Sequence, residues 1–175
     1  MEDLKQRSFF GIVFYPVVLL LVLIPGDYYH RHPDFSNQLI ILVMGICLFR
    51  LIHWPVSRWL APRFVRLNNQ LFFLSVALTA LIWGVGFAKF MLQDGEFNAN
   101  LLMVICTVGL AAGAAVAFLP YFRLAFVFSF FMLMPAIIMM GINGINTPLL
   151  IALLLMFLYL CFMAYRGNRE YWSAL

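Results

Sequence analysis

Apolar residues fill six long runs of the chain, and short polar connections separate these runs. A helix needs about 20 mostly apolar residues to cross the hydrocarbon core of a bilayer, and each run comes close to that length. The pattern therefore predicts an all-α membrane protein, one domain over residues 1–175 with six transmembrane helices. The predicted spans cover residues 8–25, 37–52, 71–90, 98–119, 124–140 and 148–165.

The composition supports this class and leaves little chain for a soluble domain. The sequence is 65% hydrophobic and 10% charged, whereas a soluble domain is about 45–50% apolar and about 25% charged. The first run lacks a small-residue cleavage site, so we expect it to stay as a span and not to be removed as a signal peptide. The net charge of +4 does not suggest nucleic acid, and the expected partner of the surface is the lipid bilayer.

The basic residues are distributed unevenly between the two sets of connections. Lys and Arg are enriched in short cytoplasmic loops. With six spans, two cations, Arg31 and Lys89, fall on the side opposite the termini. The other nine fall on the side of the termini: Lys5, Arg7, Arg50, Arg58, Arg63, Arg66, Arg123, Arg166 and Arg169. This asymmetry predicts that both termini are cytoplasmic.

The fourth run is rich in Gly and Ala. At helical spacing Gly109, Gly113 and Ala117 share one face, with Ala112 beside them. In a bilayer, small residues let two helix backbones approach closely, and such contacts drive helix association. We therefore expect these residues to pack helices together and the fourth span to lie at the centre of the bundle. The alternative is that Gly and Ala are merely tolerated there.

Polar groups inside a membrane are costly and are functional candidates by default. The predicted spans contain no carboxylate, and no Arg lies near the centre of a span, which disfavours ion or proton transport. The sequence shows no G-x-S-x-G, H-E-x-x-H or P-loop spacing, so we predict no catalytic site and no cofactor. The candidate ligand-binding residues lie between the third and fourth spans: Thr79, Trp83, Lys89 and Thr107. For Lys89 the alternative is snorkelling to the interface, and for Trp83 it is core packing.

Two other groups of residues could carry chemistry. The first connection contains His30 and His32 with two aspartates; such residues can bind Zn²⁺ or respond to pH near neutrality, but an ordinary solvated loop is favoured. The three cysteines, Cys47, Cys106 and Cys161, lie in separate apolar runs. That spacing is typical of small buried residues. We predict no metal site.

Several short motifs follow one another in a recognisable order. They are Trp83-Gly84, the Gly/Ala-rich stretch 109–114, Pro120 and Pro135. Over about residues 58–165 the chain resembles the N-terminal membrane region of certain bacterial signalling proteins. In that group a basic loop precedes a span ending in Trp-Gly, a Gly/Ala-rich span then ends in Ala-x-x-Pro, and the next span has a mid-helix proline. The basic loop here runs from Arg58 to Arg66.

The resemblance implies a sensory role. Those proteins continue into a histidine kinase core, often with a receiver domain, or into a diguanylate cyclase domain. An output domain would accordingly follow Leu175; the 175 residues contain no kinase histidine motif and no cyclase motif. The architecture also overlaps with six-span kinases that detect small lipophilic autoinducers, an analogy that supplies no binding residues.

We therefore expect a sensory input domain in the bacterial cytoplasmic membrane, homodimeric in its full-length protein, that detects a small lipophilic or membrane-borne signal. The last helix would transmit the signal, and we expect it to continue through Gly167, although Gly commonly ends helices. Tyr171, Trp172 and Leu175 would then share a helical stripe suited to a stalk. The alternative is a small self-contained transporter or channel. A membrane enzyme acting on lipid is disfavoured for want of a polar site.

Overall fold

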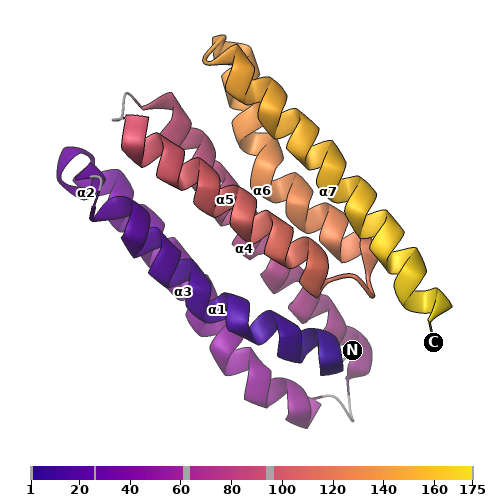
Figure 1. The fold of residues 1–175 in the computed structure, drawn as a ribbon. Helices are drawn as coiled ribbons and strands as arrows, with labels where there is room; N and C mark the ends of the chain where they lie inside the picture. Colours follow the sequence, from indigo (N-terminus) through magenta and orange to yellow (C-terminus); the bar gives the residue numbers. More distant parts are fainter. Residues whose placement is uncertain (1, 26, 61–63, 94–96, 175) are drawn as a thin grey trace.

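The computed structural model describes residues 2–25, 27–60, 64–93 and 97–174, and the side chains within 11–25, 27–57, 64–93 and 100–174. Every element in these ranges is a helix (Figure 1). The helices are α1 (Glu2–Leu23), α2 (Tyr28–Arg31), α3 (Pro33–Leu60), α4 (Val65–Leu92), α5 (Phe97–Ala117), α6 (Phe122–Asn143) and α7 (Thr147–Ser173). Arg63 and Leu175, which the sequence predictions include, lie outside the described residues.

Five of the helices, α3 to α7, are long and apolar enough to cross a membrane. This confirms an all-α architecture with several membrane-spanning helices. The described side chains of α1 form a shorter apolar stretch, Gly11–Leu23. A sixth span at residues 8–25 therefore stays a prediction, together with the side of the membrane on which each end lies.

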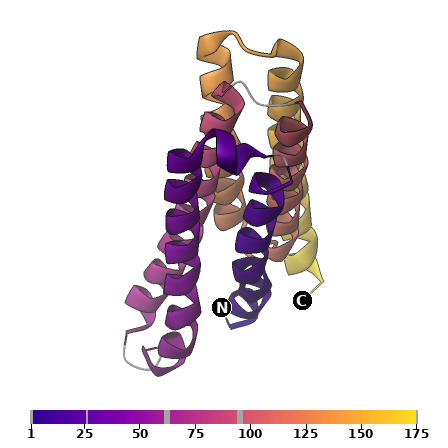
Figure 2. The same ribbon diagram turned by 90° about the vertical axis from the view of Figure 1, so that its left-hand side faces the viewer.

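The long helices run side by side, and the chain reverses direction at each connection (Figures 1 and 2). Both termini lie at one end of the bundle, with the turn between α5 and α6. The short helix α2 and the turn between α6 and α7 lie at the other end (Figure 2).

The centre of the bundle is α4, packed most extensively against α6. Of the apolar window in α4, 56% is buried, against 22% in α5. The expectation that the Gly/Ala-rich fourth span forms the centre is therefore wrong. At Gly109 and Gly113 an added Cβ would meet no atom within 4 Å, so within this chain these residues leave space and make no close helix contact. Ala112 and Ala117 are partly buried.

The close contact between helices is made instead by Gly84 of α4. A Cβ there would overlap the carbonyl oxygen of Phe131 in α6 and lie 3.0 Å from that of Met132. Pro135 explains why the Phe131 carbonyl is available, because proline has no N–H to donate to the residue four positions earlier. Neighbouring helices can cover a carbonyl freed in this way. In Gly84 a hydrogen on Cα takes the place of the Cβ and therefore points toward the Phe131 oxygen. This is the geometry of a weak C–H···O hydrogen bond.

The last helix continues through Gly167 to Ser173, as predicted. Gly167 lies where α7 crosses the end of α5, and a Cβ there would overlap the side chain of Leu119. Glycine gives the Leu119 side chain room here, although the tip of that side chain could shift, and it does not end the helix.

A candidate ligand groove between α1 and α5

A cavity of about 470 Å³ lies between α1 and α5, which are neighbours in the bundle (Figure 1). We call it the α1–α5 groove. Its lining residues are Gly11, Phe14, Tyr15 and Val18 of α1, Cys106, Gly109, Leu110, Gly113, Ala114 and Ala117 of α5, together with Arg50, Phe118 and Phe128. The groove exists because Gly109 and Gly113 have no side chain to fill it.

The lining is apolar apart from Tyr15, Cys106 and Arg50. The volume falls within the range of about 300–1,000 Å³ that is usual for small-molecule pockets, which are mostly apolar with a few polar groups. Arg50 is buried, with 6% of its surface exposed. Its Nη1 donates a hydrogen bond to Thr79 Oγ1 at 3.4 Å. The arrangement suits a mostly apolar ligand.

Arg50 also borders a second, much smaller hollow of about 20 Å³. This hollow is lined by Ile12, Arg50, His53, Trp54, Ser57, Phe72 and Ser75. The volume suffices for about one water molecule, and the lining offers polar partners. Close by, Asn68 Nδ2 donates to the Ser57 carbonyl at 3.2 Å, joining α4 to α3. Arg50 thus lies between a polar hollow on one side and the apolar groove on the other.

Arg50 does not stand out in the sequence, because the predicted second span ends at residue 52 and this arginine lies at its edge. The helix instead runs to Leu60, with Pro55 inside it. One signal could have found the residue: Leu39, Val43, Cys47, Arg50 and Ser57 recur at intervals of three, four or seven and are all buried. Residues at such spacing share one helix face, so Arg50 belongs to the inward face of α3.

Three of the four predicted ligand residues come together behind the groove. Trp83 Nε1 donates to Thr107 Oγ1 at 3.0 Å, and Thr79 Oγ1 donates to the Ser75 carbonyl at 2.7 Å. Thr79, Trp83 and Thr107 are each at most 2% exposed, and none lines the groove. The Trp83–Thr107 bond joins α4 to α5, as polar side chains do in membrane bundles, whereas the Thr79–Ser75 bond lies within α4. The structure thus fits the packing interpretation of Trp83 and moves the candidate pocket from α4–α5 to α1–α5.

Tyr15 connects this buried cluster to the groove. Its ring meets the ring of Trp83 edge-on, with centroids 5.5 Å apart and planes at 65°. Edge-to-face geometry is a favourable aromatic arrangement. A change in the position of Tyr15 would therefore alter its ring contact with Trp83. Because Trp83 donates a hydrogen bond to Thr107, the change would extend to Thr107 as well.

Lys89, the fourth predicted residue, does not join this group. It is exposed, and its Nζ lies 4.6 Å from the centroid of the Phe35 ring. A cation over an aromatic face at this distance is a cation–π contact. The position fits the snorkelling interpretation.

The connection that contains His30 and His32 folds as α2. Tyr28 stacks on Phe90 with ring centroids 3.8 Å apart, and its hydroxyl donates to Gln93 Oε1. Burial raises the pKa of Tyr28 to about 12, an effect that nearby Arg31 partly offsets. Among the described residues, no group of three or more His, Cys, Asp or Glu is placed to hold a metal ion.

The end of α7 is fastened to the turn that follows α5. Asn168 Nδ2 donates to the Leu119 carbonyl at 2.6 Å, and Trp172 Nε1 donates to the Pro120 carbonyl at 3.2 Å. We call these two bonds the tail clamp. Both acceptor carbonyls belong to the turn that follows Ala117, the last residue of α5, so each bond joins α7 to that turn.

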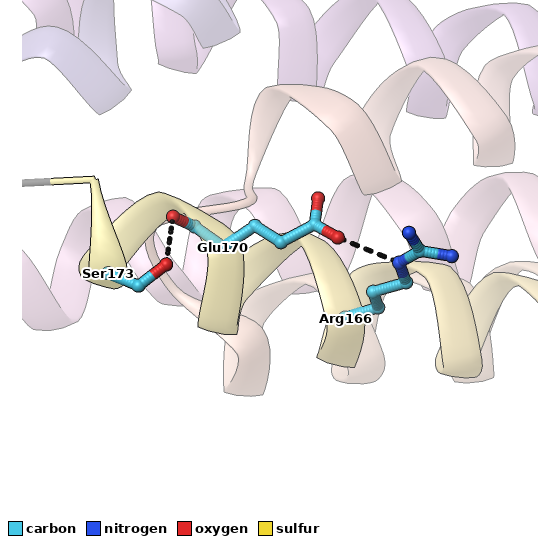
Figure 3. A network of polar contacts seen from close by, with 3 residues as sticks. All are labelled: Arg166, Glu170 and Ser173. Carbon is cyan, nitrogen blue, oxygen red and sulfur yellow. Dashed lines mark hydrogen bonds and ion pairs between the residues drawn. The ribbon is translucent and has the colours of Figure 1, made fainter.

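A second set of contacts in the tail is local to α7 (Figure 3). Arg166 Nε lies 2.7 Å from Glu170 Oε1, and Ser173 Oγ donates to the Glu170 carbonyl at 2.9 Å. The Arg166 and Glu170 side chains are 65% and 64% exposed. Solvent screens an exposed pair one turn apart, so the pair contributes little to stability. The tail clamp, which joins separate segments of the chain, is therefore what positions the end of α7.

Comparison of the chain with models of protein families, with curated proteins and with solved structures finds no match. The groove, Arg50 and the tail clamp are therefore the observations from which a function can be proposed.

Proposed function

We propose that the chain is a membrane-embedded sensory input domain that binds a small lipophilic or membrane-borne signal in the α1–α5 groove. The observation that carries the proposal is the groove itself, about 470 Å³ with a mostly apolar lining. The two helices that form its walls also carry exposed apolar side chains, among them Val17 of α1 and Ile105 of α5. In a bilayer such side chains contact lipid, so a lipophilic molecule would reach the groove sideways from the membrane.

The tail clamp would transmit the effect of ligand binding in the α1–α5 groove to the end of α7. The wall that contains Gly109 and Gly113 belongs to α5, and α5 leads directly into the Leu119–Pro120 turn. Asn168 and Trp172 hold α7 to the carbonyls of that turn. A ligand that changes the separation of α1 and α5 would shift the turn and, with it, the end of α7. Such a ligand must bind one of the two arrangements more tightly than the other.

In this proposal the domain belongs to a bacterial signalling protein, a dimeric sensor histidine kinase of the cytoplasmic membrane with both termini in the cytoplasm. The charge asymmetry and the motif order support it. The structure also gives the motif residues physical roles. Gly84 fits against the Phe131 carbonyl that Pro135 leaves without a helical partner, and the Pro120 carbonyl accepts from Trp172.

The test is a chimera in which a histidine kinase core follows Leu175, reconstituted in liposomes and assayed for autophosphorylation. Gly113→Leu places a side chain in the groove and should change the basal activity, whereas Gly45→Leu should not. Gly45 is a matched control, since it too has open space at its Cβ and does not line the groove.

Insertions after Arg166 test transmission in the same chimera. One residue rotates the following helix by about 100° and should alter the activity, while seven residues make nearly two full turns and should restore it. Autophosphorylation that is unchanged by Gly113→Leu and by both insertions would contradict a sensory role.

A further inference from the structure

Another groove lies beside the principal helix contact of the bundle, between α4 and α6. Its volume is about 650 Å³, and it shares no lining residue with the α1–α5 groove. We call it the α4–α6 groove. Among the described residues that line it, Arg123 and Gln70 are polar and the others are apolar.

The polar and apolar parts of this groove lie at different depths. α4 and α6 both begin at the end of the bundle that holds the termini (Figure 1). Arg123 lies in the first turn of α6, whereas the lining residue Val127 lies one turn further from that end. On α4 the lining runs from Leu67 to Ala77, which is roughly 15 Å at about 1.5 Å per residue. The hydrocarbon core of a bilayer is about 30 Å thick, so the lining is about as long as one leaflet.

The helices that form the groove leave its polar end positively charged. Neither α4 nor α6 contains an Asp or Glu, and the described carboxylate at this end of the bundle, that of Glu170, lies beside Arg166. Arg123 is exposed, and Arg66 adds a second cation in the first turn of α4. Because both helices begin here, the positive ends of both helix dipoles lie at this end as well. The complementary ligand group is an anion.

An anionic phospholipid matches both parts of the groove. Basic pockets between membrane helices bind anionic lipid head groups, and a guanidinium can donate two parallel hydrogen bonds to a phosphate. Gln70 has an amide that can bond to the hydroxyls of a glycerol head group. The apolar lining beyond these two residues is placed to contact an acyl chain.

We propose that the α4–α6 groove binds one anionic phospholipid with a glycerol head group, with its phosphate on Arg123 and an acyl chain along the apolar lining. The lipid belongs to the leaflet at the end of the bundle that holds the termini. This inference goes beyond the proposed function and does not depend on it, because the two grooves are separate.

The experiment measures lipid binding to the purified 175-residue chain in micelles of a neutral detergent, by native mass spectrometry. Phosphatidylglycerol and phosphatidylcholine with the same acyl chains are titrated separately, since they differ only in the head group. The unaltered protein should bind phosphatidylglycerol about tenfold more tightly, because one charge-assisted hydrogen bond corresponds to about that change in affinity. Soluble glycerol phosphate, which lacks the acyl chains, should not bind measurably.

Charge variants test the contact with the head group. Arg123→Gln should lower the affinity for phosphatidylglycerol to that for phosphatidylcholine. Arg123→Lys should keep part of the preference, because it retains the charge without the planar fork. Arg169→Gln is the matched control and should bind normally, since it removes the same charge from an exposed arginine near the end of α7 that does not line the groove.

A second pair of variants tests the contact with the acyl chain. Ala77→Phe would fill the far part of the groove and should abolish the retention of both lipids. Leu78→Phe, at the next position of α4 and outside the lining, should bind both lipids as the unaltered protein does. Neither side chain is fully buried, so we expect both variants to fold.

Each contrary outcome overturns the proposal in a distinct way. Equal affinity for the two lipids would show that the groove does not select an anion. An equal loss in Arg123→Gln and Arg169→Gln would show a diffuse attraction to the basic end of the bundle and no site. Binding of glycerol phosphate as tight as that of the lipid would make a free phosphate the occupant, and full lipid binding by Ala77→Phe would place the lipid elsewhere.

Discussion

Gly84→Ala is expected to be the most damaging single methyl addition in the bundle. The new Cβ would overlap the Phe131 carbonyl oxygen and stand 3.0 Å from the Met132 carbonyl oxygen. Both obstacles are backbone atoms of a helix, so no rotamer change relieves them and α4 and α6 must separate. Overpacking costs about 1–3 kcal/mol and occasionally more, and we expect the upper end here. Replacing Gly by Ala inside a helix returns about 1 kcal/mol, which leaves a net loss of roughly 2 kcal/mol.

Gly113→Ala is the matched comparison, because its Cβ meets nothing within 4 Å. It gains the same roughly 1 kcal/mol of helix propensity without a clash, so the two variants should differ by about 3 kcal/mol. At roughly 2–4 °C per kcal/mol for a chain of this size, their Tm values in detergent micelles should differ by about 6–12 °C. Equal Tm values would refute the inference that the α4–α6 backbone contact is what holds the bundle together.

Pro135 allows a further check on the same contact. Pro135→Ala supplies an N–H to the Phe131 carbonyl and so draws that oxygen back toward its own helix. The cost of Gly84→Ala should shrink in this background, and the double-mutant cycle should show a coupling between the two sites. Additive effects would indicate that the proline does not control the position of the carbonyl.

Three other predictions follow from the described contacts. In a cysteine-free background, Asp34→Cys should react with an impermeant thiol reagent from outside the cell and Glu170→Cys should not. The reverse pattern would contradict cytoplasmic termini. Ser36 is fully buried and is therefore unsuitable as the outer probe. A cycle of Trp83→Phe and Thr107→Val should give a coupling of about 0.6–1.7 kcal/mol, the range for hydrogen bonds between membrane helices, and zero coupling would mean that the bond between them contributes nothing. Burial raises the pKa of Tyr28 from 10.0 to about 12, so the unfolded chain loses this proton first and stability should fall as pH rises through that window; Tyr28→Phe should flatten the fall, and an unchanged slope would count against burial as its cause.

The sequence predicts the helical class and most spans because a helix must be long and apolar enough to cross the bilayer, and five helices meet this requirement. It does not distinguish the two uses of a small residue. Gly84 admits another backbone, whereas Gly109 and Gly113 leave a groove. That difference depends on the neighbouring helix and is not encoded at the glycine itself. Gly84 is in contact because a proline on a helix two spans later exposes a carbonyl there.

The candidate site was predicted in part for a related reason. Thr79, Trp83 and Thr107 stand out as polar or aromatic residues in apolar runs, and the structure does bring them together. Arg50 does not stand out, because an arginine close to the expected end of a span is what the positive-inside pattern leads one to expect. The helix around it continues past Pro55 to Leu60, whereas Trp54 is typical of the end of a span.

The pairing of α4 with α6 has a consequence for biosynthesis. These two helices are not consecutive, since α5 is made between them and lies to one side of the pair. When α4 leaves the translocon its principal neighbour does not yet exist, so Gly84, which packs against α6 in the folded protein, faces lipid or a chaperone. Independent insertion followed by later association is the usual course for membrane helices. Here the second stage must wait for α6, so a nascent chain released after α5 should be inserted yet remain open to quality-control proteolysis.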